Sequence, residues 1–280
     1  MEPPAVRPGR CVSIGLFTRV QQVLSRTVEA IAPVPGAPAA ARAGKALAAR
    51  GMLASFGYFH ARDAGPEAIV GACRALAEQM RTRPGACLAI KAPPLEFDRG
   101  HLQAIAQAAG AAGMTVVLDS LTPAQAQQTL DLADELAFGV ALPARWGRSV
   151  ADAARFRDMP VRIRLIRGEW ADPAGDPLDV ATAYLDLVRL LAGRAAPVGI
   201  ATHDPALAAP ALRILREAGT PCELEQLRGL PGHRTRRIAA GQGVPVRVYW
   251  PYGPGWWPYA AEKLMERPYL PWWWLRDRVG

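Results

Sequence analysis

The chain has 280 residues and a formal net charge of +8, and half of its residues are hydrophobic. Its length and composition allow one large domain with a sizeable core. The positive charge does not indicate a nucleic-acid partner, because the arginines are scattered along the chain instead of forming a patch. The exception is the short cluster Arg234, Arg236 and Arg237. The chain has only three lysines, which are Lys45, Lys91 and Lys263.

Neither the cysteines nor the N-terminus indicates export. The four cysteines have no C-x-x-C spacing and stand mostly in apolar segments, which is typical of free thiols in a reducing cytosol. The first ten residues, MEPPAVRPGR, contain no apolar signal-peptide region, and no apolar run reaches the length of a membrane span. We therefore expect a soluble cytoplasmic protein.

The first 50 residues predict a helical arm. Residues 1–12 are rich in proline and are expected to be disordered. A helix is predicted over 14–32, followed by a Pro/Gly/Ala linker and an alanine-rich helix that ends near Gly51.

From residue 51 onward, β-type segments alternate with helical patterns. The predicted strands cover 52–59, 87–92, 115–120, 138–142, 161–168, 198–202, 222–227 and 246–250. Thr122-Pro123, Ser149 with Asp152, and Asp204-Pro205 mark helix starts, and residues 180–191 carry one continuous apolar stripe.

Strands that alternate with helices predict a parallel sheet, and eight such units predict closure into a (β/α)8 TIM-type barrel over 51–280, with a Trp-rich C-terminal tail. An open, doubly wound sheet is the alternative. The absence of G-x-G-x-x-G after the first strand argues against a dinucleotide-binding unit.

In such a barrel the chemistry lies at the carboxyl ends of the strands. Polar residues at the predicted strand ends are Lys91, Asp119, Ser120, Thr202, His203 and Tyr249. Alternation along the fifth strand puts Arg162 and Arg164 on one face, which we expect to point into the barrel. Buried arginines need an anionic partner, either Asp119 or a bound ligand, or they form an internal ion pair that only fills the barrel. A structural histidine is the alternative to a ligand-binding role at His203.

The C-terminal stretch 246–268, VRVYWPYGPGWWPYAAEKLMERP, resembles the signature of the proline dehydrogenase family. That signature reads R-x-Y-x-P-Y-G, then an aromatic-Pro-Tyr, then R-R-x-x-E-R/N-P. Five further segments resemble family motifs in the same order along the chain. They are 90–91 (S-L-K-L), 118–119 (I-D-M-E), 164–168 (R-L-V-K-G), 201–204 (A-T-H-N) and CELEQLRG at 222–229 (F-E-F-Q-M-L-Y-G).

The resemblance implies an FAD-containing barrel that oxidises proline to a cyclic imine, with electrons passing to a quinone. By position it implies Asp119, Arg164 and Lys91 as catalytic residues. The implied cofactor-binding residues are Ser120, Arg164, Arg167, Gly168, Thr202 and His203. The implied substrate-binding residues are Lys91, Glu169, Trp170, Tyr249, Glu262 and Lys263. No metal site is expected.

The chain departs from the family pattern at its predicted pocket. Glu262-Lys263 replaces the arginine pair that binds the proline carboxylate, Glu169 replaces an alanine, and Trp170 replaces a tyrosine. Pro143 stands where the family has a glutamine that hydrogen-bonds the flavin. The balance of charge becomes more anionic, which favours a cyclic or secondary amine other than proline itself.

Two other interpretations remain open. The chain could be a flavin-free barrel, either a binding or scaffold protein or an enzyme that uses Asp119, Glu169 and Lys91, with Lys91 forming a Schiff base. The tryptophans at 256–257 and 272–274 are consistent with a tail packed over the barrel, or with a membrane-surface or subunit contact.

Overall fold

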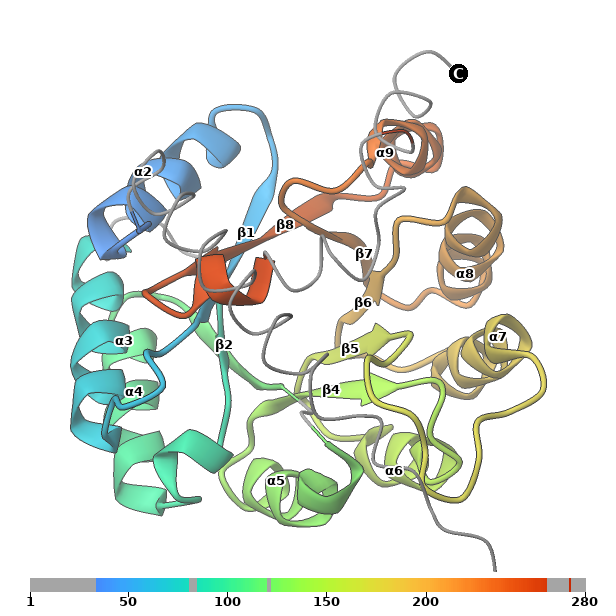
Figure 1. The fold of residues 1–280 in the computed structure, drawn as a ribbon. Coiled ribbons are helices and arrows are strands. Elements are labelled where there is room, and N and C mark those ends of the chain that lie inside the picture. Colours follow the sequence, from blue (N-terminus) through green and yellow to red (C-terminus); the bar gives the residue numbers. More distant parts are fainter. Residues whose placement is uncertain (1–33, 81–84, 120–121, 261–271, 273–280) are drawn as a thin grey trace, which may run out of the picture.

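The computed structural model describes residues 34–80, 85–119, 122–260 and 272. Eight parallel strands form a closed barrel in which each strand pairs with its neighbours in sequence and β8 closes on β1 (Figure 1). The strands are β1 Leu53–Tyr58, β2 Cys87–Ile90, β3 Thr115–Leu118, β4 Gly139–Pro143, β5 Ile163–Ile166, β6 Val198–Ala201, β7 Cys222–Leu227 and β8 Val246–Tyr252. All eight predicted strands and the predicted barrel closure are confirmed.

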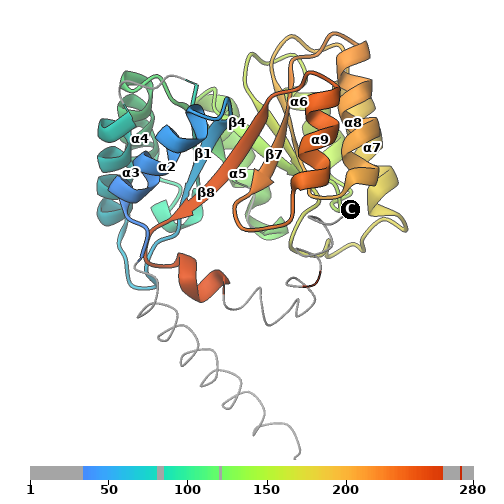
Figure 2. The same cartoon turned by 90° about the horizontal axis from the view of Figure 1, so that it is seen from above.

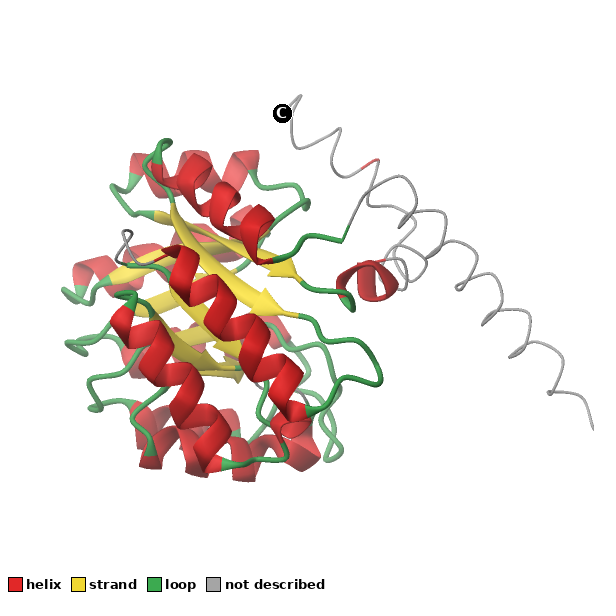
Figure 3. Ribbon diagram, turned by 90° about the vertical axis from the view of Figure 1, so that its left-hand side faces the viewer, coloured by secondary structure: helices red, strands yellow, loops and turns green. Residues whose placement is uncertain are grey.

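Helices surround the strands on the outside (Figures 1 and 3). They are α2 Ala37–Ala48, α3 Pro66–Met80, α4 Arg99–Ala111, α5 Pro123–Glu135, α6 Ser149–Phe156, α7 Val180–Leu191, α8 Pro205–Glu217 and α9 His233–Gly241, with the short 3-10 helix η1 Pro93–Leu95. The alanine-rich helix of the predicted arm corresponds to α2, which packs against α3, β1 and β8. The helix predicted over 14–32 lies outside the described residues.

Strand β8 is longer than predicted. We expected it to end at Trp250, but it continues through Pro251 to Tyr252. Pro251 pairs with Gly57 of β1, and the Tyr252 carbonyl accepts a hydrogen bond of 2.7 Å from the Phe59 amide. Because the carbonyls of β8 still have partners on β1, the proline does not end the strand.

Two of the three predicted helix starts hold the expected residue at the cap position. Asp204 caps α8, its carboxylate accepting a hydrogen bond of 2.9 Å from the Ala206 amide, and Thr122 precedes α5. The prediction that Ser149 caps α6 is wrong. Ser149 is buried inside the first turn and donates its hydroxyl to the Pro143 carbonyl at 2.7 Å, because that carbonyl at the end of β4 needs a partner.

The main hydrophobic core lies between the strands and the helices. The predicted stripe of α7 is confirmed, with Tyr184, Leu187, Val188 and Leu191 buried against the barrel. Outward-facing strand residues such as Ile163 complete this layer. The alternate residues of the strands therefore face the barrel interior, where the charged side chains gather.

The short helical segment 256–260 follows β8 and lies over the carboxyl end of the barrel (Figures 1 and 2). Within the described part of the chain, no helix is long and apolar enough to cross a membrane.

Candidate active site

Five charged side chains, from β5 and the residue directly before it, from β7 and from β8, form an ion-pair network inside the barrel. Arg162 pairs with Glu223 at 2.7 Å and with Glu225 at 3.0 Å. Arg164 reaches Glu225 at 3.3 Å, and Arg247 reaches Glu223 at 2.7 Å. The prediction that both arginines of the fifth strand point inward is confirmed.

Glycines on two neighbouring strands leave room for Arg162, one for its guanidinium and one for its backbone. A β-carbon at Gly199 of β6 would lie 2.3 Å from Arg162 Nη2. A β-carbon at Gly139 of β4 would lie 2.7 Å from the Arg162 carbonyl oxygen. Any larger residue at Gly199 would therefore displace the Arg162 guanidinium.

Asp119 follows β3 and joins the network at the carboxyl end of the barrel. Its carboxylate is paired with Arg164 and accepts a hydrogen bond of 3.2 Å from the Tyr249 hydroxyl. The Tyr249 ring lies 5.1 Å from the Arg164 guanidinium carbon. This position exists because β1 has glycine opposite: a β-carbon at Gly57 would lie 1.8 Å from the Tyr249 hydroxyl oxygen. The prediction of Asp119 as a partner for the inward arginines is confirmed.

Burial and neighbouring charges determine the protonation of this cluster. Burial opposes ionisation of Glu225, but the guanidinium groups of Arg164, Arg162 and Arg247 outweigh it and hold its pKa below the usual range. Burial raises the pKa of Tyr249 to about 12, so its hydroxyl remains a donor at neutral pH.

Lys91 follows β2 and lies at the barrel mouth. It adds a fourth positive charge to those of the three arginines in the network. Its ammonium nitrogen lies 4.0 Å from the centre of the Phe59 ring and 3.4 Å from the Tyr58 carbonyl oxygen. Burial, followed by repulsion from Arg164, lowers its pKa to about 8, although nearby Glu169 acts in the opposite direction.

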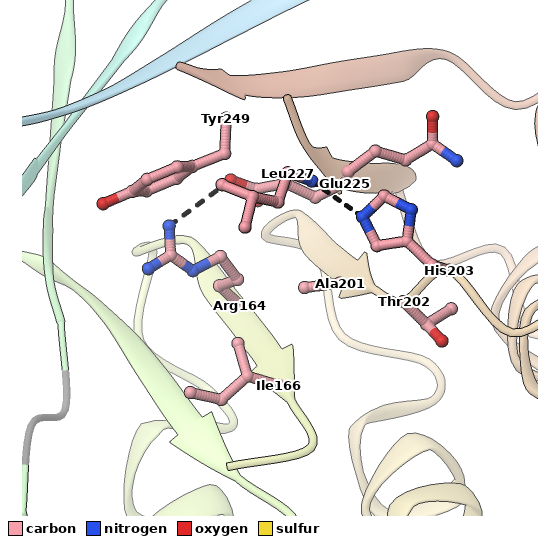
Figure 4. Close-up of a pocket in the computed structure, with 9 residues that line it drawn as sticks. Arg164, Ile166, Ala201, Thr202, His203, Glu225, Leu227 and Tyr249 are labelled. Atoms are coloured by element: carbon pink, nitrogen blue, oxygen red, sulfur yellow. Dashed lines mark hydrogen bonds and ion pairs between the residues drawn. The ribbon is translucent and has the colours of Figure 1, made fainter. Parts of the chain in front are cut away.

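A cavity of about 200 Å³ opens between the carboxyl ends of β5, β6, β7 and β8 (Figure 4). Arg164 and Glu225 are among its charged lining residues, and Ile166 and Leu227 are among its apolar ones. The Arg164 Nε is buried and has no hydrogen-bond partner among the described residues. The predicted site residues that line this cavity are Arg164, Thr202, His203 and Tyr249.

His203 and Thr202 also hold the loops together. The His203 ring donates from Nδ1 to the Pro231 carbonyl at 2.5 Å and accepts at Nε2 from the Leu227 amide at 3.0 Å. These two partners assign the neutral, Nδ1-protonated tautomer. The Thr202 hydroxyl accepts from the Asp204 amide at 3.0 Å. Both ring nitrogens of His203 are therefore used by the backbone, as the structural interpretation of His203 expected, whereas the Thr202 hydroxyl accepts here and keeps its own O–H as a donor.

The loop after β5 lies outside the cavity. Arg167 and Glu169 are exposed, and Trp170 is 52% exposed. Gly168 has a φ of +97°, and a β-carbon there would lie 2.9 Å from the Pro143 side chain, so only glycine fits without strain. The structure does not bring Arg167, Gly168 or Trp170 to the cavity.

A residue that our sequence interpretation missed holds this loop. Arg145 donates to the Glu169 carbonyl at 2.8 Å and forms an ion pair with Asp176. The Glu169 carboxylate accepts a hydrogen bond of 3.3 Å from the Tyr259 hydroxyl. Glu169 therefore faces the barrel mouth from a fixed backbone.

Aromatic rings cover the same mouth. Phe59 packs against Trp256 with ring centres 5.4 Å apart and against Tyr259 at 5.1 Å, while Trp256 lies 6.4 Å from Trp257. Trp256 is buried, which agrees with packing over the barrel, whereas Trp272 is 70% exposed. Ser120, Glu262, Lys263, Trp273 and Trp274 lie outside the described residues.

The cavity fits the edge of a flavin ring. Its walls are largely apolar, and the buried Arg164 Nε offers one unused donor to an acceptor atom of the ring. Pro143 has no amide to offer, as its sequence predicted, and its carbonyl already accepts from Ser149. Flavin contact would therefore depend on Arg164 and on the apolar surfaces of the neighbouring strands.

Comparison with known proteins agrees with this fold. The chain is 26% identical over 180 residues to proline dehydrogenase 1 of Bacillus subtilis, covering 60% of this chain and 59% of the relative. It is 32% identical over 139 residues to the proline dehydrogenase of Deinococcus radiodurans, covering 46% and 44% of the two chains. The matched region thus spans less than two thirds of either relative. No protein-family model matches the chain.

Solved structures share the barrel. Proline utilization A from Bdellovibrio bacteriovorus, inactivated by N-propargylglycine, superimposes with a TM-score of 0.73 at 14% identity, covering 91% of this chain and 34% of that one. Proline utilization A from Corynebacterium freiburgense gives a TM-score of 0.66 at 18% identity, covering 91% and 32%. These likenesses to solved structures describe the fold. Together with the sequence matches, they support a divergent member of the proline dehydrogenase family.

Proposed function

We propose that the protein is an FAD-dependent dehydrogenase that oxidises a C–N bond of a cyclic or secondary amine related to proline. The observation that carries this proposal is the cavity at the carboxyl end of the barrel, where the unpartnered Arg164 Nε is buried beside Asp119 and Glu225. Bound FAD would supply the oxidant, accepting a hydride from the carbon next to the amine nitrogen.

The chain's own residues would orient the cofactor and substrate. Arg164 would donate from Nε to the flavin ring, while Asp119 and Glu225 hold its guanidinium in place. The apolar walls would keep water out of the reaction site. His203 would contact the cofactor through its ring surface, because both ring nitrogens already bond the backbone, whereas Thr202 could still donate its hydroxyl. Arg167, Gly168 and Ser120 remain proposed cofactor ligands from the family resemblance.

Substrate selection would depend on the charges at the barrel mouth. Lys91 in its ammonium form would hold an anionic group, and near pH 8 its neutral form could accept a proton from the substrate amine. Glu169 brings a carboxylate to the same region. Together with Glu262 in place of an arginine, this charge favours a cationic nitrogen and a substrate other than proline. Trp170 and Lys263 complete the proposed substrate-binding set with Tyr249.

We further propose that electrons pass to a quinone and that the protein works in the cytoplasm at a membrane surface. The exposed Trp272 supports a surface contact of the Trp-rich C-terminal segment. A vesicle flotation assay with and without a Trp272→Ala substitution tests this contact. Equal flotation of both proteins would count against a contribution from Trp272.

The decisive experiment is a flavin spectrum of the purified protein, before and after incubation with FAD. We expect a yellow protein that bleaches anaerobically with a cyclic amine more readily than with proline. Colourless protein that takes up no FAD would refute the proposal.

Exchange of Glu262 and Lys263 tests the substrate preference. Glu262→Ala should weaken transition-state binding of the preferred amine by about 2–5 kcal/mol, as for a desolvated charged contact. The double substitution Glu262→Arg/Lys263→Arg should move activity toward proline. If neither change affects turnover of a flavin-loaded enzyme, this segment does not contact the substrate.

A flavin-free function has one specific observation in its favour. The lowered pKa of Lys91, about 8, makes its amine more nucleophilic near neutral pH, as a Schiff base requires. Borohydride trapping of a carbonyl compound on Lys91, with Lys91→Met as the control, distinguishes this second candidate from the dehydrogenase.

A further inference from the structure

Glu225 is the carboxylate that joins the cavity to the ion-pair network below it. It is 2% exposed and lines the cavity. Its two oxygens contact different arginines, Arg164 at 3.3 Å and Arg162 at 3.0 Å. We infer that Glu225 lowers the reduction potential of a flavin bound in this cavity, because it neutralises the guanidinium that faces the ring. This inference rests on the proposed function.

The charges inside the barrel support this role. Three arginines in the network are matched by three carboxylates, which are Asp119, Glu223 and Glu225. Arg164 alone is held by two of these carboxylates. A guanidinium that is already paired twice gives less net positive potential to a neighbouring ring than an unpaired one.

Reduction makes a flavin more negative, so positive potential at the ring favours the reduced form. A buried carboxylate next to Arg164 has the opposite effect, because its negative charge disfavours the reduced form. The low dielectric constant around buried groups makes this electrostatic interaction strong. The pKa of Glu225 is held below its usual range, so the carboxylate remains charged at neutral pH.

The same strand supplies a matched control. Glu223 is two residues earlier on β7 and also pairs with buried arginines, Arg162 at 2.7 Å and Arg247 at 2.7 Å. However, its ion pairs do not include Arg164, and it does not line the cavity. Removal of its charge therefore disturbs the network without changing the direct partners of the cavity guanidinium.

The experiment compares Glu225→Gln, Glu225→Asp and Glu223→Gln in the FAD-loaded protein of 280 residues. Midpoint potentials are measured by spectroscopic titration against a reference dye, and FAD affinity by fluorescence quenching. We expect Glu225→Gln to raise the preference for reduced over oxidised flavin about tenfold, which is about 30 mV for a two-electron couple. Glu225→Asp should stay near the wild-type potential, and Glu223→Gln should shift it less than Glu225→Gln.

An unchanged or lower potential in Glu225→Gln would overturn the inference, as would an equal shift in Glu223→Gln. If Glu225→Gln does not fold by circular dichroism, Asp119→Asn removes the other carboxylate on Arg164 and carries the same expectation of a raised potential. A wild-type protein that takes up no flavin refutes the proposed function itself. Flavin uptake with equal potentials in wild type and Glu225→Gln refutes only the role of Glu225.

Discussion

Replacement of Lys91 by methionine should make the protein more stable at pH 7. In the folded state, burial and the nearby Arg164 lower the pKa of Lys91 from 10.5 to about 8. That difference corresponds to a cost of about 3 kcal/mol for keeping Lys91 charged in the folded protein. Methionine removes this cost but loses the contact of the ammonium with the Phe59 ring, which is worth roughly 1 kcal/mol. The expected net gain in the free energy of unfolding is about 2 kcal/mol.

The pH dependence gives the sign of this effect independently. A lysine with a lowered pKa in the folded state binds fewer protons there than in the unfolded state between about pH 8 and 10.5. The wild-type stability should therefore rise by about 3 kcal/mol, relative to Lys91→Met, as pH increases through this window, so the gain of the variant should be lost within it. Urea unfolding at several pH values measures both curves. Lys45→Met, at an exposed position on α2, serves as the control and should leave stability nearly unchanged.

A less stable Lys91→Met variant at pH 7 would refute this reasoning, and so would a gain that does not change with pH. Either result would mean that the ammonium has a compensating ionic partner in the folded protein. The same titration should affect binding. If Lys91 holds an anionic group of the substrate, the Michaelis constant should rise above about pH 8 in the wild type and change little in the variant.

Three further substitutions test individual features of the fold. Arg194→Met should cost about 3–5 kcal/mol in urea unfolding, because this buried guanidinium donates to several backbone carbonyls that would lose their partner, and an unchanged midpoint would contradict that role. Gly57→Ala should lower the free energy of unfolding by about 1–3 kcal/mol and reduce turnover, because the added methyl group displaces Tyr249. The control Gly71→Ala, at an open helical position of α3, should be neutral or slightly stabilising. Equal thermal shifts of the two variants would argue against the steric explanation. Asp204→Ala should lower the free energy of unfolding by about 1 kcal/mol through loss of the α8 cap, and Asp204→Asn should retain most of it.

The inward arginines of the fifth strand show what the alternation of side chains along a strand can predict and what it cannot. Alternation along a strand predicted that Arg162 and Arg164 share the interior face, and Asp119 at another strand end was one expected partner. Glu223 and Glu225 alternate in the same way on β7, so the same rule could have identified them as interior carboxylates. Their pairing with particular arginines could not be predicted, since it depends on barrel register and on the space left by Gly199.

Some of the predicted cofactor-binding residues line the cavity and others do not. Arg164, Thr202 and His203 meet at one cavity because their strands are neighbours in the barrel. Arg167 and Gly168 come directly after β5, but they belong to a loop that leads away from the cavity. Arg145, paired with Asp176, holds the backbone of this loop. Sequence adjacency therefore did not predict which side chains line the cavity.

The sequence by itself determined the eight alternating units, the closed barrel and the polar character of the strand ends. These features depend on local periodicity and on the rule that parallel strands connected by helices bury their outer faces. Only the tertiary structure decided which charges neutralise one another, which donor remains unused and how far burial lowers the pKa of Lys91. The physical reason is that ion pairing and desolvation depend on distances of a few ångströms between residues far apart in the chain, such as Asp119 and Tyr249, and local patterns do not encode those distances.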